Sequence, residues 1–261
     1  MVKRKSTIWL IPVLLIVFIV AFGSGFFVNS FLNPSKIVEK YVYIEVKQNL
    51  TFSSSTTNVV AVSEDGSGIV GKAIIELVPG KKRILINTEP FIEADTQLSA
   101  ETAIKYALNY TKFDIRNNDL IVSFNMSFAN TTEADVVGGP SAGSALAVAT
   151  IAVLENKIIR SDIALTGTVE LNGSIGKVGS VPEKAAAAGA AGMKIFLVPK
   201  NQAKITYSEK ISETENSGGF EIKKIRYVQK IDSLNNYTLS QWNMTTIEVD
   251  NVVDALQYVF Q

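Results

Sequence analysis

Gly138-Gly139-Pro140-Ser141-Ala142-Gly143-Ser144-Ala145 predicts a tight turn that runs directly into a helix. The two leading glycines allow backbone angles closed to other residues, and Pro140 suits the first helical position. An almost unbroken apolar run continues to Leu154 and extends the predicted helix over 140–156. The Ser141 hydroxyl is therefore expected at a helix N-terminus, where free backbone N–H groups and the helix dipole stabilise a developing oxyanion. Ser141 is the candidate nucleophile, and Gly139 is expected to support the turn.

A serine nucleophile needs a base, and the composition restricts which base is present. The chain contains no His and no Cys, which excludes Ser-His-Asp and Cys-His chemistry and leaves lysine as the tunable base. Lys184 lies in a predicted helix that begins at Pro182 and continues through the small residues of 185–192. Small neighbours permit close packing and exclude water, which depresses a lysine pKa. The alternative is that Lys184 is a solvated residue in the first turn of a helix.

These stretches resemble the proteolytic domain of Lon proteases, which carry the serine in a Gly-Pro-Ser-Ala-Gly motif. The resemblance covers most of residues 58–205. Its motifs follow the family's order at 139–143, 164–173, 178–179, 183–184, 190–194 and 197–201. The resemblance implies an α/β (α+β) fold of the Lon type, with mixed sheets and packed helices.

The resemblance also implies the roles of individual residues. Lon proteases use a Ser-Lys dyad, so the match implies that Ser141 and Lys184 form that dyad. The matching threonine of Lon lies beside the dyad, which implies that Thr166 orients the lysine. Gly138 is a departure, because many Lon proteases have an acidic residue at this position. Asp135 is the nearest carboxylate in sequence.

The periodicity of apolar residues predicts the remaining elements. Strands are predicted at 69–78, 83–87, 120–128, 163–166, 194–199 and 247–249, and helices at 97–110, 140–156, 182–192 and 252–260. The strands 69–78 and 83–87 are expected to pair as a hairpin, and Asn172-Gly173 is expected to close a second hairpin. The 97–110 helix is interpreted as a packed amphipathic helix without a functional role. The Ser/Thr-rich segment 51–58 is predicted to be a flexible spacer, and the polar segment 206–242 an insertion or lid.

The N-terminus predicts a membrane anchor. Residues 1–5 form a basic cluster, no charged residue follows until Lys36, and residues 8–28 are enough to cross ~30 Å of hydrocarbon as a helix. Basic residues on the leading side predict a single-pass protein of the cell membrane with an extracytoplasmic catalytic domain. The alternative is a cleaved signal peptide with processing at 21–23, but the apolar run through 26–32 favours retention.

The predicted organisation is therefore an anchor at 1–35, a linker at 36–57 and a Lon-like serine protease domain at 58–261, with a polar insertion near 206–242. The 25 basic and 25 acidic residues are balanced, which argues against a nucleic-acid partner. Without His and Cys, neither a metal site nor a cofactor is expected. Glycosylation sequons make the chain a glycoprotein candidate. They occur at Asn49, Asn109, Asn125, Asn130, Asn172, Asn236 and Asn243.

The expected function is that of a membrane-anchored, ATP-independent serine endopeptidase. ATP independence is expected because the chain has no Gly-x-x-x-x-Gly-Lys-Ser/Thr phosphate-binding loop. The expected substrates are unfolded or extended polypeptide segments, which would add as a strand beside the sheet. The resemblance further implies a homo-oligomer. The alternative hypothesis is a catalytically silent Lon-like domain that acts as a membrane-tethered binding or assembly module.

Overall fold

The computed structural model describes residues 16, 19, 53–63, 65–126, 136–217 and 220–261. The chain divides into two units, residues 1–48 and 49–261. In the first unit the described residues Ile16 and Ile19 are helical. The rest of the predicted anchor lies outside the described residues, as does the predicted linker up to residue 52. No helix in the described part of the chain is both long enough and apolar enough to span a membrane.

A mixed sheet forms the centre of the second unit. Among the described residues it has seven strands in the order β13-β10-β7-β1-β2-β5-β3. Their bounds are Ser53–Val62 (β1), Gly68–Pro79 (β2), Ile84–Ile86 (β3), Asn118–Met126 (β5), Ile163–Leu165 (β7), Ile195–Pro199 (β10) and Thr245–Val249 (β13). β2 pairs antiparallel with both β1 and β5, whereas β3, β7, β10 and β13 join by parallel pairing. The prediction of a mixed α/β fold is confirmed.

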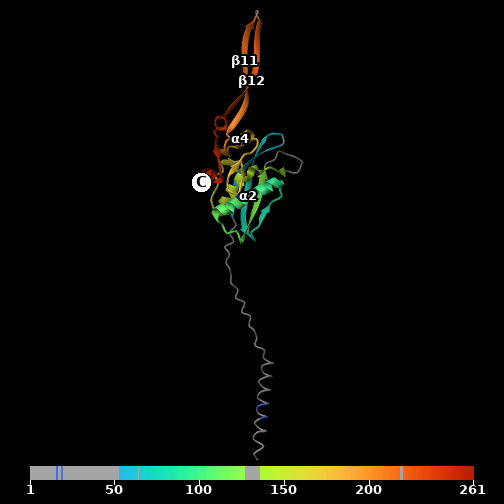
Figure 1. Ribbon diagram of the computed structural model, residues 1–261, viewed down its shortest axis with the longest axis vertical. Coiled ribbons are helices and arrows are strands. Elements are labelled where there is room, and N and C mark those ends of the chain that lie inside the picture. Colours follow the sequence, from blue (N-terminus) through green and yellow to red (C-terminus); the bar gives the residue numbers. More distant parts are fainter. Residues whose placement is uncertain (1–15, 17–18, 20–52, 64, 127–135, 218–219) are drawn as a thin grey trace, which may run out of the picture. The chain divides into compact units, whose positions relative to one another are not determined.

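Helices cover both faces of this sheet (Figure 1). Their bounds are Ala94–Thr111 (α2), Pro140–Ala142 (the 3-10 turn η2), Gly143–Glu155 (α3), Val181–Ala190 (α4), Leu234–Trp242 (α5) and Val252–Val259 (α6). Successive strand residues point to opposite faces, so Val59 packs in the core with α2, α3 and α6, while Val60 packs with α4 and α5. α3 is buried over residues 143–153, as its continuous apolar run predicts.

The predicted hairpin between 69–78 and 83–87 is wrong. β3 pairs in parallel with β5, and the hairpin partner of β2 is β1. The cause is Asp119, a buried carboxylate in β5 that accepts hydrogen bonds from the Lys81 N–H at 2.7 Å and the Arg83 N–H at 2.8 Å. The Arg83 side chain adds a charge-assisted bond and holds the pKa of Asp119 at about 2. These bonds direct the chain after β2 toward β5.

The predicted spacer at 51–58 is also corrected, because β1 begins at Ser53 and pairs with β2 from its first residue. Ser55 and Thr57 are buried while Ser54 and Thr56 are exposed, which is the alternation of a half-buried strand. Hydroxyl residues do not mark this pattern as clearly as apolar ones. The β-branched threonines nevertheless suit a pleated strand.

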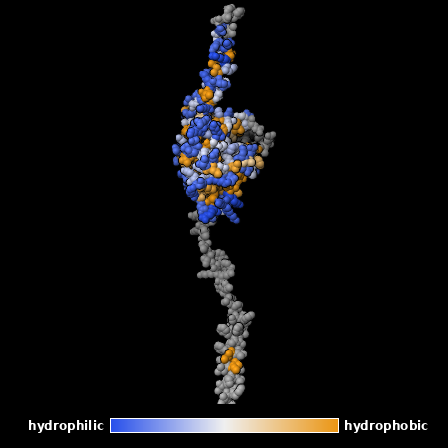
Figure 2. Space-filling model, in the orientation of Figure 1, coloured by the Kyte–Doolittle hydropathy of each residue, from blue (hydrophilic) through white to orange (hydrophobic). Residues whose placement is uncertain are grey.

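The segment 206–242, predicted as a polar insertion, contains two different structures. β11 (Lys204–Ser217) and β12 (Phe220–Ser233) form a long antiparallel hairpin, along which Figure 2 shows apolar side chains interspersed with polar ones. α5 instead belongs to the core, since Leu234 is fully buried and Trp242 packs against Gly189 of α4.

The described residues of the second unit also form two short sheets. β4 (Phe91–Ile92) pairs in parallel with β6 (Val136–Val137), just before the serine turn. β8 (Thr168–Val169) and β9 (Ile175–Gly176) form the second predicted hairpin, which is confirmed. Gly173 has the expected positive φ of 88° in its turn.

Candidate active site

The serine turn lies between β6 and α3. Gly139 has a φ of 86°, which favours glycine, and Pro140 opens the 3-10 turn that contains Ser141. The Ser141 side chain is half-buried. The backbone carbonyl of Ser141 accepts a hydrogen bond from the Gly167 N–H at 2.8 Å, and the Ser144 N–H donates to the Gly167 carbonyl at 2.9 Å. The segment after β7 therefore fixes the backbone of the turn on one side.

The first turns of α2 hold the serine turn on its other side. Asp95 Oδ1 accepts from the Gly139 N–H at 3.2 Å, and the Thr96 hydroxyl donates to the Gly139 carbonyl at 3.0 Å. The Ser99 hydroxyl donates to the Pro140 carbonyl at 3.0 Å. Both backbone groups of Gly139 are therefore bonded to side chains of α2, and its N–H is bound to a carboxylate.

The sequence of α2 by itself predicts only a packed amphipathic helix, without a functional role. The sequence feature that could have indicated a role is a pair of hydroxyl residues, Thr96 and Ser99. They lie three positions apart on the face of α2 that carries Ala100 and Ala103. All four side chains are buried. Polar side chains on a buried stripe need hydrogen-bond partners, and here the partners are the carbonyls of the serine turn.

Lys184 reaches the same region from α4. Lys184 is only 5% exposed, and its Nζ donates a hydrogen bond to the hydroxyl of buried Thr166 at 3.5 Å. Thr166 Oγ1 in turn donates to the Ser141 carbonyl at 3.4 Å. Thr166 therefore lies between the lysine and the serine turn. Among the described residues no hydrogen bond joins Lys184 Nζ directly to Ser141 Oγ. In enzymes without substrate such contacts are often long.

Burial changes the chemistry of this amine. It lowers the pKa of Lys184 from its ordinary 10.5 to about 8, because the charged form loses hydration. Close packing causes the burial. A Cβ at Gly68 of β2 would lie 2.4 Å from the Glu183 carbonyl, so only glycine lets the strand approach α4 here. Lys184 forms no ion pair with a carboxylate in the described part of the chain, so no such pair opposes the downward shift.

The region that contains this site matches a known protein family. Residues 99–239, more than half of the chain, match the family described as the Lon protease (S16) C-terminal proteolytic domain. The chain belongs to this Lon family. Membership supports a serine protease function, and the serine turn, α3, Thr166 and Lys184 all lie inside the matched residues.

Several curated Lon proteases are similar to this Lon-family chain. Lon protease 1 of Syntrophobacter fumaroxidans is 31% identical over 145 residues, which is 56% of this chain and 17% of that protein. Lon protease 1 of Myxococcus xanthus is 30% identical over 157 residues, covering 56% of this chain and 19% of that protein. The archaeal Lon protease of Archaeoglobus fulgidus is 27% identical over 179 residues, or 67% and 27%. The chain thus aligns with less than a third of the length of these relatives.

Gly138 is the position at which this chain departs from the acidic residue of many Lon proteases. It lies against the carboxylate of Glu93 from another part of the domain. A Cβ built at Gly138 would lie 2.1 Å from Glu93 Oε2, so the Glu93 side chain occupies the space of a side chain at 138. Glu93 precedes α2, and its N–H donates to the Val137 carbonyl at 3.0 Å. Asp135, the nearest carboxylate in sequence, lies outside the described residues.

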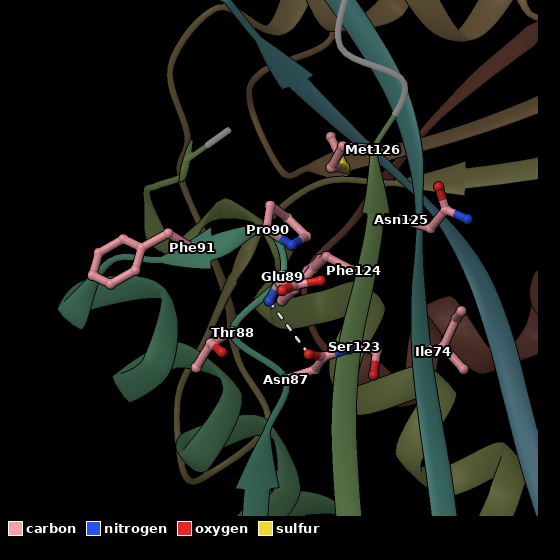
Figure 3. A pocket seen from close by; sticks show the side chains of 10 residues that line it. All are labelled: Ile74, Asn87, Thr88, Glu89, Pro90, Phe91, Ser123, Phe124, Asn125 and Met126. Carbon is pink, nitrogen blue, oxygen red and sulfur yellow. Dashed lines mark hydrogen bonds between the residues drawn. The ribbon is translucent and has the colours of Figure 1, made fainter. Parts of the chain in front are cut away.

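A cavity of about 690 Å³ lies between β4 and the end of β5 (Figure 3). Its lining includes Pro90 and Phe91 on one side and the strand residues 123–126 on the other. β4 pairs with β6, which leads directly into the serine turn. In the described residues no group of three or more His, Cys, Asp or Glu side chains is arranged to hold a metal ion.

Proposed function

We propose that this Lon-family chain is a serine endopeptidase with Ser141 as the nucleophile and Lys184 as the general base. The observation that supports the proposal best is the burial of Lys184 beside Thr166, with a pKa of about 8. Roughly one-tenth of such an amine is neutral at pH 7, against well under a thousandth of a free lysine. A neutral amine can accept a proton, and a solvated lysine at this pH cannot do so efficiently.

The proposed reaction proceeds through an acyl-enzyme. Neutral Lys184 Nζ takes the Ser141 Oγ proton while Oγ attacks the scissile carbonyl carbon, which gives a tetrahedral oxyanion and an ammonium. The ammonium then protonates the departing amine as the C–N bond breaks. Lys184 next takes a proton from water, whose oxygen attacks the ester. The collapse of this second intermediate returns the proton to Ser141. Thr166 holds the lysine, and the N-terminus of α3 favours the developing negative charge.

We propose that peptide hydrolysis by this chain needs no nucleotide. Gly66–Ala73 has the glycine and lysine spacing of a phosphate-binding loop, but Ala73 stands where Ser or Thr binds the cation. Gly68–Pro79 is also a strand, so no helix N-terminus follows to receive phosphates.

Membrane tethering through residues 8–28, with the domain outside the cell, is part of the same proposal. It rests on the apolar span and on the basic residues before it.

The experiment compares full-length wild-type protein with Ser141→Ala and with Ser240→Ala, a control that removes an exposed serine hydroxyl. We expect labelling by a fluorophosphonate probe and cleavage of unfolded casein by wild type and Ser240→Ala, without added nucleotide. Ser141→Ala should show neither, with an unchanged unfolding midpoint. Equal cleavage by Ser141→Ala would refute the nucleophile assignment. Wild type that is neither labelled nor active would favour the binding-module alternative.

A further inference from the structure

The loop that leads into the lysine helix is held by one side chain from another part of the fold. Residues 177–180 connect β9 to α4. The Val178 N–H donates to Gln202 Oε1 at 2.9 Å, and Gln202 Nε2 donates to the Val178 carbonyl at 2.7 Å. The amide thus pairs with both backbone groups of one residue. In the described part of the chain, no other hydrogen bond joins this loop to a segment distant in sequence.

The start of α4 has little local support. Ser180 is its N-cap residue, but the side chain makes no capping bond among the described residues. The φ of Ser180 is 54°, in the left-handed region, and such a conformation persists only where the surrounding structure enforces it. Beyond its first turn, α4 buries only the small residues Ala185, Ala188 and Gly189, so it has no large side chain there to fix its position. The two bonds from Gln202 therefore help to fix the first turn of the helix.

That first turn carries Lys184. The Lys184 N–H donates to the Ser180 carbonyl at 3.0 Å, so one hydrogen bond connects the lysine backbone to the loop. The Thr166 N–H, in turn, donates to the Leu197 carbonyl of β10 at 3.1 Å. Gln202 lies in the short connection between β10 and β11. β10 and the residues just after it therefore position both the amine and the hydroxyl that it contacts.

Charged side chains do not account for the state of this amine. α4 packs against β1, β2, β10 and α5, and of these elements only β2 carries charged residues, Lys72 and Glu76. β2 approaches the lysine helix at Gly68, so both lie about 13 Å or more farther along the strand. The other charged residue of α4 is the exposed Glu183. Burial is thus the cause of the lowered pKa, and it depends on where α4 holds Lys184.

We propose that Gln202 is a positioning residue for the general base. Its paired bonds to Val178 hold the loop before α4 and so keep the Lys184 amine buried. The inference rests on the proposed endopeptidase function and extends the site to the connection between β10 and β11. In the described residues Gln202 makes no hydrogen bond to Lys184 or Ser141, so its effect passes through the loop.

The pH profile of activity separates this role from a purely structural one. Full-length Gln202→Met protein has a side chain of similar length that cannot make the two bonds. A looser loop should admit water to the amine and raise its pKa by about one unit toward that of free lysine. The midpoint of kcat/KM for a fluorogenic peptide should rise equally, with a roughly tenfold loss at pH 7 and recovery by pH 10. Loss of folded protein alone would lower kcat/KM by the same factor at every pH.

Two further variants complete the test. Gln202→Asn keeps the amide on a side chain one methylene shorter, so it should give a smaller shift in the same direction, even if Gln202→Met does not fold. Gln229→Met is the matched control, because that glutamine bonds to the Ser208 hydroxyl within the β11–β12 hairpin, and its midpoint should equal that of wild type.

An unchanged midpoint in the folded Gln202 variants would overturn the inference. A wild-type profile without an ionisation near 8 would instead overturn the assignment of Lys184 as the base, and this inference with it. The two failures are therefore distinguishable in the same set of measurements.

Discussion

Lys184 is the residue on which the proposed chemistry depends most, because only its neutral form accepts a proton. Burial makes the ammonium costly, and the same burial lowers the pKa of the amine to about 8. Thr166 offers a hydroxyl to the amine without adding a negative charge that would raise the pKa again.

Activity should follow the ionisation of this amine. We expect kcat/KM to rise with pH through a single ionisation near 8, since deprotonation creates the base. Lys184→Arg should lose activity at least a thousandfold, because a guanidinium keeps its proton over the working range. Measurement of kcat/KM from pH 6 to 10 for both proteins tests this expectation. An active Lys184→Arg protein would require a different base.

Stability should report the same pKa. The folded-state value near 8 lies below the unfolded value near 10.5, so the unfolded chain binds more protons between these limits. Wild-type stability should therefore rise as the pH increases from 8 to 10.5. Lys184→Met should be inactive yet more stable at pH 7, by up to about 3 kcal/mol, with the gap closing above pH 10. Urea unfolding at pH 7 and pH 10.5 checks the sign, and a gap that widens with pH would contradict it.

At the scale of elements, α2 acts as a clamp on the serine turn. Its bonds through Asp95, Thr96 and Ser99 reach Gly139 and Pro140 across more than 40 residues of sequence. Small displacements of a nucleophile cost large factors in rate, so the clamp bears on catalysis as well as on folding.

Removal of one clamp hydroxyl tests this view. Thr96→Val keeps the shape of the side chain but leaves the Gly139 carbonyl unpaired. We expect kcat to fall about tenfold or more with KM little changed, and Thr96→Ser to restore it. Thr102→Val is the matched control, because among the described residues that hydroxyl bonds only to Leu98 of the same helix. Equal kcat in Thr96→Val and Thr102→Val would show that the clamp has no role in positioning.

The packing of α4 against α5 gives a second prediction at this scale. Alanine at Gly189 gains about 1 kcal/mol of helix propensity, but its Cβ would lie 2.4 Å from the Trp242 ring. Overpacking of a rigid ring costs about 1–3 kcal/mol, so we expect a net loss of stability from Gly189→Ala. In a Trp242→Leu background the same substitution should become stabilising. Guanidinium unfolding of the four proteins measures this coupling, and additive effects would contradict it.

At the scale of the whole molecule, the prediction concerns the side of the membrane on which the domain lies. The basic N-terminus and the apolar residues 8–28 predict an exterior domain. The chain has no cysteine, so single cysteines report position without a background. Ser240→Cys should react with a membrane-impermeant maleimide on intact cells, and Ser6→Cys only after lysis. Protection of Ser240→Cys in intact cells would show that the placement is wrong.

Much of the Lon-family domain follows from local sequence. The glycines and Pro140 specify the serine turn, and the continuous apolar run after it can only form a buried helix. The absence of His and Cys leaves lysine as the proposed base, and the small residues around Lys184 predict its burial. These features are short-range, so backbone preference and periodicity are sufficient to read them.

Other features required the tertiary structure. Asp119 directs β3 to β5 through bonds that span more than 35 residues, and no local pattern shows which strand a turn will join. Thr96 and Ser99 look like ordinary helix residues until the serine turn packs against them. Pairing of β3 with β5 ends at Val122, although β5 itself continues to Met126. Each of these features forms only when segments distant in sequence meet. The hydrogen bonds that stabilise it are therefore long-range, and local propensity does not encode them.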